Sequence, residues 1–226
     1  MNSSIPLELL NAVGPAPEWK YEMRREAQMV LPSVFLGPYT VSRDLATLQS
    51  LKITHICCIS ESREAHIYRP RFPDQFTYLV LDIRDATDQN LISKFPDVMH
   101  FIDQALAMGG RVLVHCGDGL SRSPALVTAY AMAKYNMSSD DAFQFVQTRR
   151  FCVSPNMAFI HQLDAYEPIC QARRAMAQYA SDPSNRNSRR KRADSPEEED
   201  SPMDGRQVQS DPDAQQRVPS WGGVMH

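Results

Sequence analysis

One short segment of the sequence holds residue types that could together bind and cleave a phosphate ester. His115 and Cys116 close an apolar run, and Arg122 and Ser123 follow after a five-residue loop. A loop between a strand and a helix directs successive backbone N–H groups into one concavity, and the N-terminus of the helix adds partial positive charge. Arg122 offers a planar guanidinium for two phosphate oxygens. This spacing predicts an anion site with a thiol at its base.

The side chains of this segment suggest separate roles. A positive field stabilises a thiolate, the nucleophilic form of Cys116. We expect Ser123 to donate to that sulfur and to ease its departure later, and His115 to order the loop. Asp118 is expected to point to solvent, because an inward carboxylate would repel the anion. The predicted phosphate-binding loop comprises Cys116, Gly117, Asp118, Gly119, Leu120, Ser121 and Arg122.

Strand patterns alternate with helix patterns around this loop. Apolar, β-branched runs predict strands near residues 34–36, 53–59, 76–81 and 111–115. Helical spacing follows residues 42, 95, 123, 138 and 154, with Ser42 and Ser138 as expected N-caps. The alternation predicts an α/β fold with a mostly parallel central sheet flanked by helices.

The composition divides the chain of 226 residues into three parts. Residues 1–18 are proline-containing and loop-like, and we expect a flexible N-terminal segment there. Residues 19–178 hold the periodic patterns of one folded domain. Residues 179–226 carry almost no large aliphatic side chains, and we expect a disordered tail because such a segment buries too little apolar surface to offset its ordering entropy.

Charge and hydropathy exclude several classes of protein. A formal net charge of -3 argues against a chain-wide nucleic-acid surface. No apolar run approaches the length of a membrane span, and the first residues lack the pattern of a signal peptide. The five cysteines include no C-x-x-C pair, so a metal site has little support. Because the sequence shows no secretion signal, we expect the thiols to be reduced, and we expect a monomer.

A basic run, Arg189-Arg190-Lys191-Arg192, precedes an acidic run at Glu197–Asp200. The basic run is typical of a nuclear localisation signal, although a solvated charge run has the same composition. The sequence thus predicts a cytoplasmic protein, a nuclear protein, or one that occupies both compartments.

The segment from His115 to Ser123 matches the H-C-x5-R-S signature of the cysteine-dependent protein phosphatases, and the chain resembles their dual-specificity group. The resemblance spans roughly residues 18–175 and includes Leu36–Tyr39, Tyr78–Ile83 and Arg149–Asn156. Within the group, these segments are most similar to the serine/threonine/tyrosine-interacting (STYX) branch. That branch is regarded as catalytically dead because glycine replaces its cysteine, whereas this chain has Cys116.

The resemblance implies a two-step hydrolysis with no metal or cofactor. Cys116 would attack phosphorus, and an aspartate would protonate the leaving oxygen. Counting from the strand at residues 78–81, Asp85 matches the position of that acid, with Asp82 and Asp88 as nearby alternatives. The partners implied are phosphorylated proteins, among them a MAP kinase-type protein, with no nucleic acid and no membrane.

Two functions remain open at this stage. The first is a phosphatase for phosphotyrosine and phosphoserine or phosphothreonine, since residues 61–76 lack the N-x-x-K-N-R-Y stretch that deepens the pocket of strictly tyrosine-specific relatives. The alternative is a STYX-like phospho-reader or scaffold with little turnover, because a complete cradle binds phosphate even without catalysis.

Overall fold

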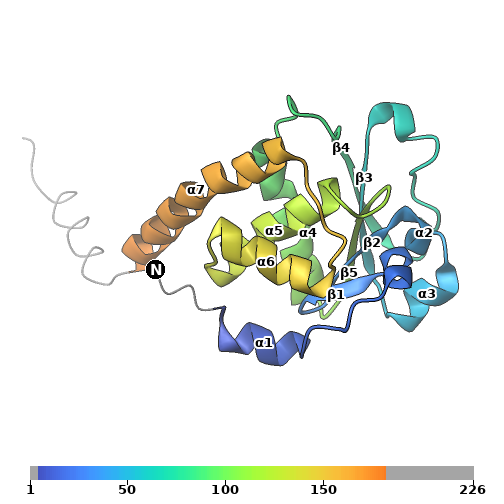
Figure 1. Cartoon of the computed structure of the whole chain (residues 1–226), viewed down its shortest axis with the longest axis horizontal. Coiled ribbons are helices and arrows are strands. Elements are labelled where there is room, and N and C mark those ends of the chain that lie inside the picture. Colours follow the sequence, from blue (N-terminus) through green and yellow to red (C-terminus); the bar gives the residue numbers. More distant parts are fainter. Residues whose placement is uncertain (1–4, 182–226) are drawn as a thin grey trace, which may run out of the picture. The chain divides into compact units, whose positions relative to one another are not determined.

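A five-stranded sheet forms the centre of the computed structural model, which describes residues 5–181 (Figure 1). Its strands lie in the order β1 (Gln28–Leu31), β2 (Val34–Pro38), β5 (Val112–Cys116), β3 (His55–Ser60) and β4 (Thr77–Asp82). The pair β1–β2 is antiparallel and the other three pairs are parallel. The predicted α/β fold with a mostly parallel sheet is confirmed.

Helices cover both faces of the sheet (Figure 1). On one side lie α4 (Phe95–Ala107), α5 (Arg122–Tyr135), α6 (Ser139–Arg149) and α7 (Met157–Ser181), and on the other lie the short α2 (Tyr39–Ser42) and α3 (Leu45–Ser50). Strand β5 serves both faces, because successive side chains of a strand point in opposite directions. Val112 and Val114 join the larger core, while Leu113 joins a smaller one with Leu48 and Ile56.

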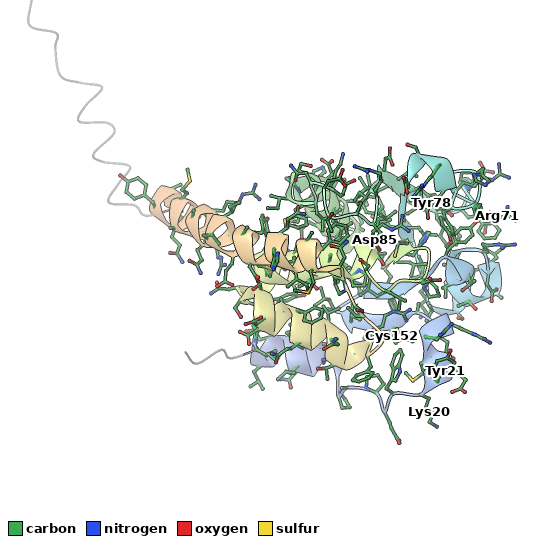
Figure 2. The ribbon with its side chains drawn as sticks, turned by 45° about the horizontal axis from the view of Figure 1, so that its top comes forward. Lys20, Tyr21, Arg71, Tyr78, Asp85 and Cys152 are labelled. Carbon is green, nitrogen blue, oxygen red and sulfur yellow. The ribbon has the colours of Figure 1, made fainter. Side chains whose placement is uncertain are left out.

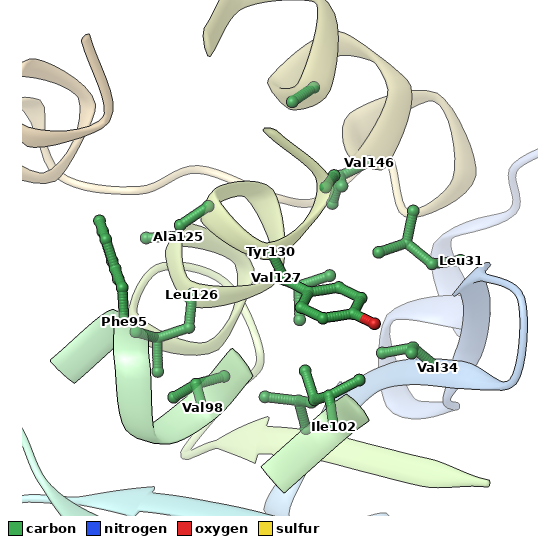
Figure 3. Close-up of a cluster of buried hydrophobic side chains, with 14 of the residues drawn as sticks. Leu31, Val34, Phe95, Val98, Ile102, Ala125, Leu126, Val127, Tyr130 and Val146 are labelled. Atoms are coloured by element: carbon green, nitrogen blue, oxygen red, sulfur yellow. The ribbon is translucent and has the colours of Figure 1, made fainter. Parts of the chain in front are cut away.

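The larger core fixes α5 against the sheet. Tyr130 lies among Leu31, Val34 and Ile102 (Figure 3). Its hydroxyl donates to a carboxylate oxygen of Asp103 at 2.8 Å, so the polar end of this buried side chain has a partner. Because β5 and α5 are both anchored in this core, the loop that joins them begins and ends at fixed points.

The helix starts match the sequence expectation at one position and differ at another. Ser138 caps α6 as predicted, and its Oγ accepts from the N–H of Asp141 at 3.1 Å. The prediction of Ser42 as the cap of the next helix is wrong, because Asp44 caps α3 with its carboxylate. Ser42 ends α2 instead, where its hydroxyl donates to the carbonyl of Tyr39.

A helix stands where the sequence indicated a loop-like start. Helix α1 (Leu7–Val13) buries Leu9 in the larger core. Arg149 of α6 donates to the carbonyl of Gly14 at 3.0 Å, just after this helix. A helix of seven residues with one buried side chain has too little apolar periodicity to be predicted from the sequence.

Three short 3-10 segments complete the described part: η1 (Tyr21–Arg25), η2 (Ser62–Glu64) and η3 (Ile92–Lys94). The compact unit ends with α7 at Ser181. Residues 182–226, with the predicted tail and basic run, lie outside the described residues. No helix within residues 5–181 is long and apolar enough to cross a membrane.

Candidate active site

Cys116 ends β5, and Arg122 begins α5, so residues 117–121 form the predicted strand-to-helix loop. The Cys116 side chain is almost entirely buried, with 3% of the residue exposed. Ser123, in the first turn of α5, donates its hydroxyl to Cys116 Sγ at 3.2 Å. The structure therefore places a hydroxyl donor on the sulfur, as the sequence predicted.

The carbonyls of the loop all accept hydrogen bonds from outside it. The N–H of Tyr39 donates to Gly117 O at 2.8 Å, and the N–H of Ser154 donates to Leu120 O at 2.7 Å. The guanidinium of Arg150 donates to both carbonyls between them. The N–H groups of residues 118–121 donate to no acceptor within residues 5–181. Carbonyls held outward leave these donors for an anion.

Glycine is required at one position of the loop. Gly119 has φ +69°, in the left-handed region, and a Cβ there would lie 2.5 Å from Gly37 O. The loop thus packs directly against the β2 backbone. Only glycine, which lacks a Cβ, allows this close approach together with the left-handed conformation.

Arg122 is buried, and one of its fully buried nitrogen atoms has no hydrogen-bond partner within the described residues. Its Nη1 donates to Glu64 Oε2 at 2.6 Å and to Ile83 O at 3.2 Å, while Nε has no partner within the described residues. Burial works against the charge of Arg122, but the hydrogen bond and charge of Glu64, together with negative charge on Cys116, raise its pKa overall. A phosphate oxygen would satisfy the orphaned Nε.

Glu64 is the charged partner of Arg122 and comes from η2, far away in the sequence. Burial opposes ionisation of Glu64, but the hydrogen bond and charge of Arg122 lower its pKa overall. The carboxylate of Glu64 therefore stays ionised near neutral pH and orients the guanidinium of Arg122.

His115 is fully buried beside the cysteine. Burial lowers its pKa to about 4, so the imidazole is neutral at physiological pH. Its Nδ1 lies 3.3 Å from Cys116 O, which can only accept, so Nδ1 carries the proton. The ring also lies 5.8 Å from the Tyr39 ring. These contacts fit the expected loop-ordering position.

Tyr68, from the segment between β3 and β4, walls the loop on one side. A Cβ on Gly117 would lie 3.1 Å from the Tyr68 hydroxyl. The Tyr68 ring meets the Tyr39 ring edge-on, with centroids 4.9 Å apart. Burial raises the pKa of Tyr68, and the nearby charges of Glu64 and Asp118 add to that rise.

Of the three candidate acids, Asp85 alone contacts the loop within the described residues. Its Oδ1 accepts from Ser121 Oγ at 2.9 Å and from Asn156 Nδ2 at 2.6 Å. Figure 2 shows Asp85 beside the first turn of α7. Asp82 instead accepts from the backbone and hydroxyl of Ser62, and Asp88 pairs with Arg84.

A pocket of about 930 Å³ adjoins the loop. Gly117, Asp118 and Leu120 form one wall, and η1 together with α2 and α3 forms the others. Tyr21 and Cys152 lie on this side of the molecule (Figure 2). Cys116, Arg122 and Asp85 are not among the residues that line this pocket.

Comparisons with known proteins identify the family of the chain. A model of the dual-specificity phosphatase catalytic domain matches residues 34–169. The chain belongs to the dual-specificity phosphatase family. The human serine/threonine/tyrosine-interacting protein is 51% identical over 160 residues, which cover 70% of this chain and 72% of the relative. Dual specificity protein phosphatase 1 of Arabidopsis thaliana is 38% identical over 143 residues, covering 63% and 70%.

Solved structures show the same family fold. The crystal structure of human tyrosine phosphatase-like serine/threonine/tyrosine-interacting protein has a TM-score of 0.63 at 50% identity, covering 64% of this chain and 97% of that one. The crystal structure of DUSP15 has a TM-score of 0.59 at 32% identity, covering 63% and 88%. The family resemblance inferred from the sequence is confirmed.

The structure brings the predicted site residues of this family member together. Cys116 ends β5 just before the loop, Arg122 and Ser123 begin α5 just after it, and Asp85 contacts the loop through Ser121. Asp118 is exposed, as expected.

Two contributors were not found from the sequence. Glu64 was passed over because it pairs with an arginine 58 residues away. Arg150 was passed over because a fully buried arginine breaks the usual hydropathy pattern.

Proposed function

We propose that this protein hydrolyses phosphotyrosine and phosphoserine or phosphothreonine in proteins through a phosphocysteine at Cys116. One observation carries the proposal: the thiol of Cys116 lies at the base of an anion cradle and accepts a hydrogen bond from Ser123. In the first step, the thiolate form of Cys116 attacks phosphorus, the bond to the leaving oxygen breaks, and Asp85 supplies its proton to that oxygen.

The second step regenerates the enzyme. Water attacks phosphorus, the sulfur–phosphorus bond breaks, and Asp85 accepts a proton from the water. The hydroxyl of Ser123 stabilises the departing thiolate, and Arg122 with the loop N–H groups holds the equatorial oxygens in both steps. No step needs a group beyond these side chains and water.

The test is hydrolysis of an aryl phosphate and of phosphopeptides by the purified full chain, with Cys116→Ser as the control. The wild type should turn over, and Cys116→Ser should lose turnover by at least about three orders of magnitude while still binding phosphopeptide. Turnover that persists in Cys116→Ser would exclude the cysteine mechanism.

A second candidate function is a phospho-reader or scaffold with little turnover. The identity to the human serine/threonine/tyrosine-interacting protein favours it. Phosphopeptide binding by the wild type without turnover of any substrate would decide for this reading.

The partners proposed for either function are phosphorylated proteins, with a MAP kinase-type protein as one candidate. Arg122 and the four unpartnered loop N–H groups support phosphate as the recognised group. We further propose action in the cytoplasm, the nucleus or both, on the basis of the basic run Arg189–Arg192.

A further inference from the structure

Arg150 is an unusual side chain in this molecule. It directly follows α6 as the C-cap residue, it is 0% exposed, and no carboxylate within residues 5–181 pairs with it. Burying a guanidinium without a counter-charge is costly, so such a group needs many hydrogen bonds or a bound anion. The contacts of Arg150 show where those hydrogen bonds go.

The guanidinium joins the phosphate-binding loop to the stretch from η1 to the first residue of β1. Nε donates to Gly119 O at 3.2 Å and Nη2 donates to Asp118 O at 3.2 Å. On the other side, Nη2 donates to Arg24 O at 3.0 Å, and Nη1 donates to Glu26 O at 2.9 Å and to the amide oxygen of Gln28. All five acceptors are neutral oxygens.

The two bonds from Arg150 to the carbonyls of Asp118 and Gly119 set the orientation of the loop peptides. By holding the carbonyls of Asp118 and Gly119 on the outer side of the loop, Arg150 leaves the loop N–H groups free for an anion. Tyr39 and Ser154 hold the flanking carbonyls through fixed backbone N–H groups. Of the four hydrogen bonds that hold these carbonyls, two come from the side chain of Arg150 and two from backbone N–H groups. Only the two from Arg150 can be removed by a side-chain substitution.

We propose that Arg150 is a positioning residue that holds the phosphate-binding loop in its anion-ready conformation. Its unpaired charge strengthens the binding of phosphate and stabilises the thiolate form of Cys116. The proposal rests on the proposed function, because it treats residues 116–122 as a phosphate site. It adds a residue that touches neither the phosphate nor the reacting sulfur.

The charge of Arg150 acts on Cys116 alongside that of several other groups. Besides Arg150, the titratable groups close enough to Cys116 to feel its charge are Arg122 on α5, Cys58 on β3 and Tyr68 from the β3–β4 segment. Burial raises the pKa of Cys58 to about 12 and also raises that of Tyr68, so both stay neutral. Of these groups, the two arginines carry the positive charge, and Glu64 pairs with Arg122 but not with Arg150.

Arg149 provides a matched control. It is also buried, with 4% exposed, and it neighbours Arg150 in the sequence. Its guanidinium donates to Gly14 O at 3.0 Å and stacks 3.9 Å above the Phe145 ring. It thus serves the N-terminal helix rather than the loop, and Arg149→Met reports what the loss of a buried arginine does to stability alone.

The experiment compares Arg150→Met, Arg150→Lys and Arg149→Met in the full chain. Titration with inorganic phosphate should show about tenfold or more weaker binding for Arg150→Met, because two charge-assisted hydrogen bonds to the loop are lost. Alkylation of Cys116 by iodoacetate at about pH 6 should slow by a similar factor. Arg150→Lys should fall between these values and the wild type, since lysine keeps the charge but lacks the fork.

Arg149→Met should lower the melting temperature yet leave phosphate affinity and alkylation within about twofold of the wild type. Equal phosphate affinity in Arg150→Met and Arg149→Met would overturn the inference. If Arg150→Met does not fold, Arg150→Lys decides alone, and wild-type values for both readouts would refute the assignment. A wild type that binds no inorganic phosphate would overturn the proposed function together with this inference.

Discussion

Replacement of Asp85 should affect the rate of turnover without weakening the binding of phosphate. Asp85 contacts Ser121 at the rim of the loop but is not among the cradle donors. If it is the general acid, Asp85→Asn should reduce turnover of phosphoserine peptides by about 10²–10⁴ and that of nitrophenyl phosphate much less, because a nitrophenolate departs without a proton. Steady-state kinetics on both substrates measures the difference. The alkaline limb of the pH–rate profile should flatten.

The neighbouring carboxylates supply the controls for this prediction. Asp82 is held by Ser62, and Asp88 is held by Arg84, so Asp82→Asn and Asp88→Asn should retain the leaving-group dependence of the wild type. If one of them shows the signature instead, the acid has been assigned to the wrong aspartate. If none of the three shows it, the cradle works without an acid and the reader function becomes the stronger candidate.

His115 makes a prediction about stability and pH. Its folded pKa of about 4 lies below the usual 6.5 because of burial, so below pH 6.5 the unfolded chain binds a proton that the folded chain does not. Its contribution is complete above pH 6.5 and is lost as the pH falls towards 4. Between pH 7 and pH 5 this costs about 2 kcal/mol of unfolding free energy.

Urea denaturation at both pH values tests this prediction. His115→Asn removes the titration, so the variant should lose about 2 kcal/mol less than the wild type over the same interval. Burial also lowers the pKa of His55, which contributes a loss of the same sign in both proteins and cancels in the comparison. Equal losses in the two proteins would show that His115 does not govern the acid sensitivity.

At the scale of elements, the segment between β3 and β4 sets two walls of the site. Glu64 orients Arg122, and Tyr68 lies against Gly117. We expect Tyr68→Ala to lower kcat/KM for phosphotyrosine peptides by about two- to tenfold, because an aromatic contact with the substrate ring is lost. Phosphothreonine peptides should change less. Tyr68→Phe should keep the wild-type preference, and an equal loss for both peptides would argue against a role in selectivity.

The site residues that are adjacent in the sequence could be predicted, whereas those brought together by the fold could not. The loop at residues 116–122 was predictable because strand, glycines, arginine and helix start are contiguous in the chain. Contacts between distant segments were not predictable, because Glu64 and Arg150 act through pairings that depend on the folded topology. The helix start at Asp44 rather than Ser42 was missed because both side chains are suitable N-caps and α2 decides between them.

At the scale of the whole molecule, the compact unit ends at Ser181, and a charged segment follows it in the sequence. The sequence there separates a basic run, Arg189–Arg192, from an acidic run, Glu197–Asp200. We expect removal of residues 182–226 to leave the melting temperature and aryl phosphatase activity unchanged, because a segment with so few large apolar side chains can bury little surface. Nuclear enrichment of a fluorescent fusion should fall.

The replacement of Arg189–Arg192 by alanines in the full chain is the matched control for this truncation. If the basic run is the localisation signal, this variant should lose nuclear enrichment to the same extent, with unchanged melting temperature and activity. Loss of enrichment on truncation alone would assign the signal to another part of the tail. A marked fall in melting temperature after truncation would show that residues 182–226 pack on the folded unit, because a solvated charged segment contributes little to the free energy of unfolding.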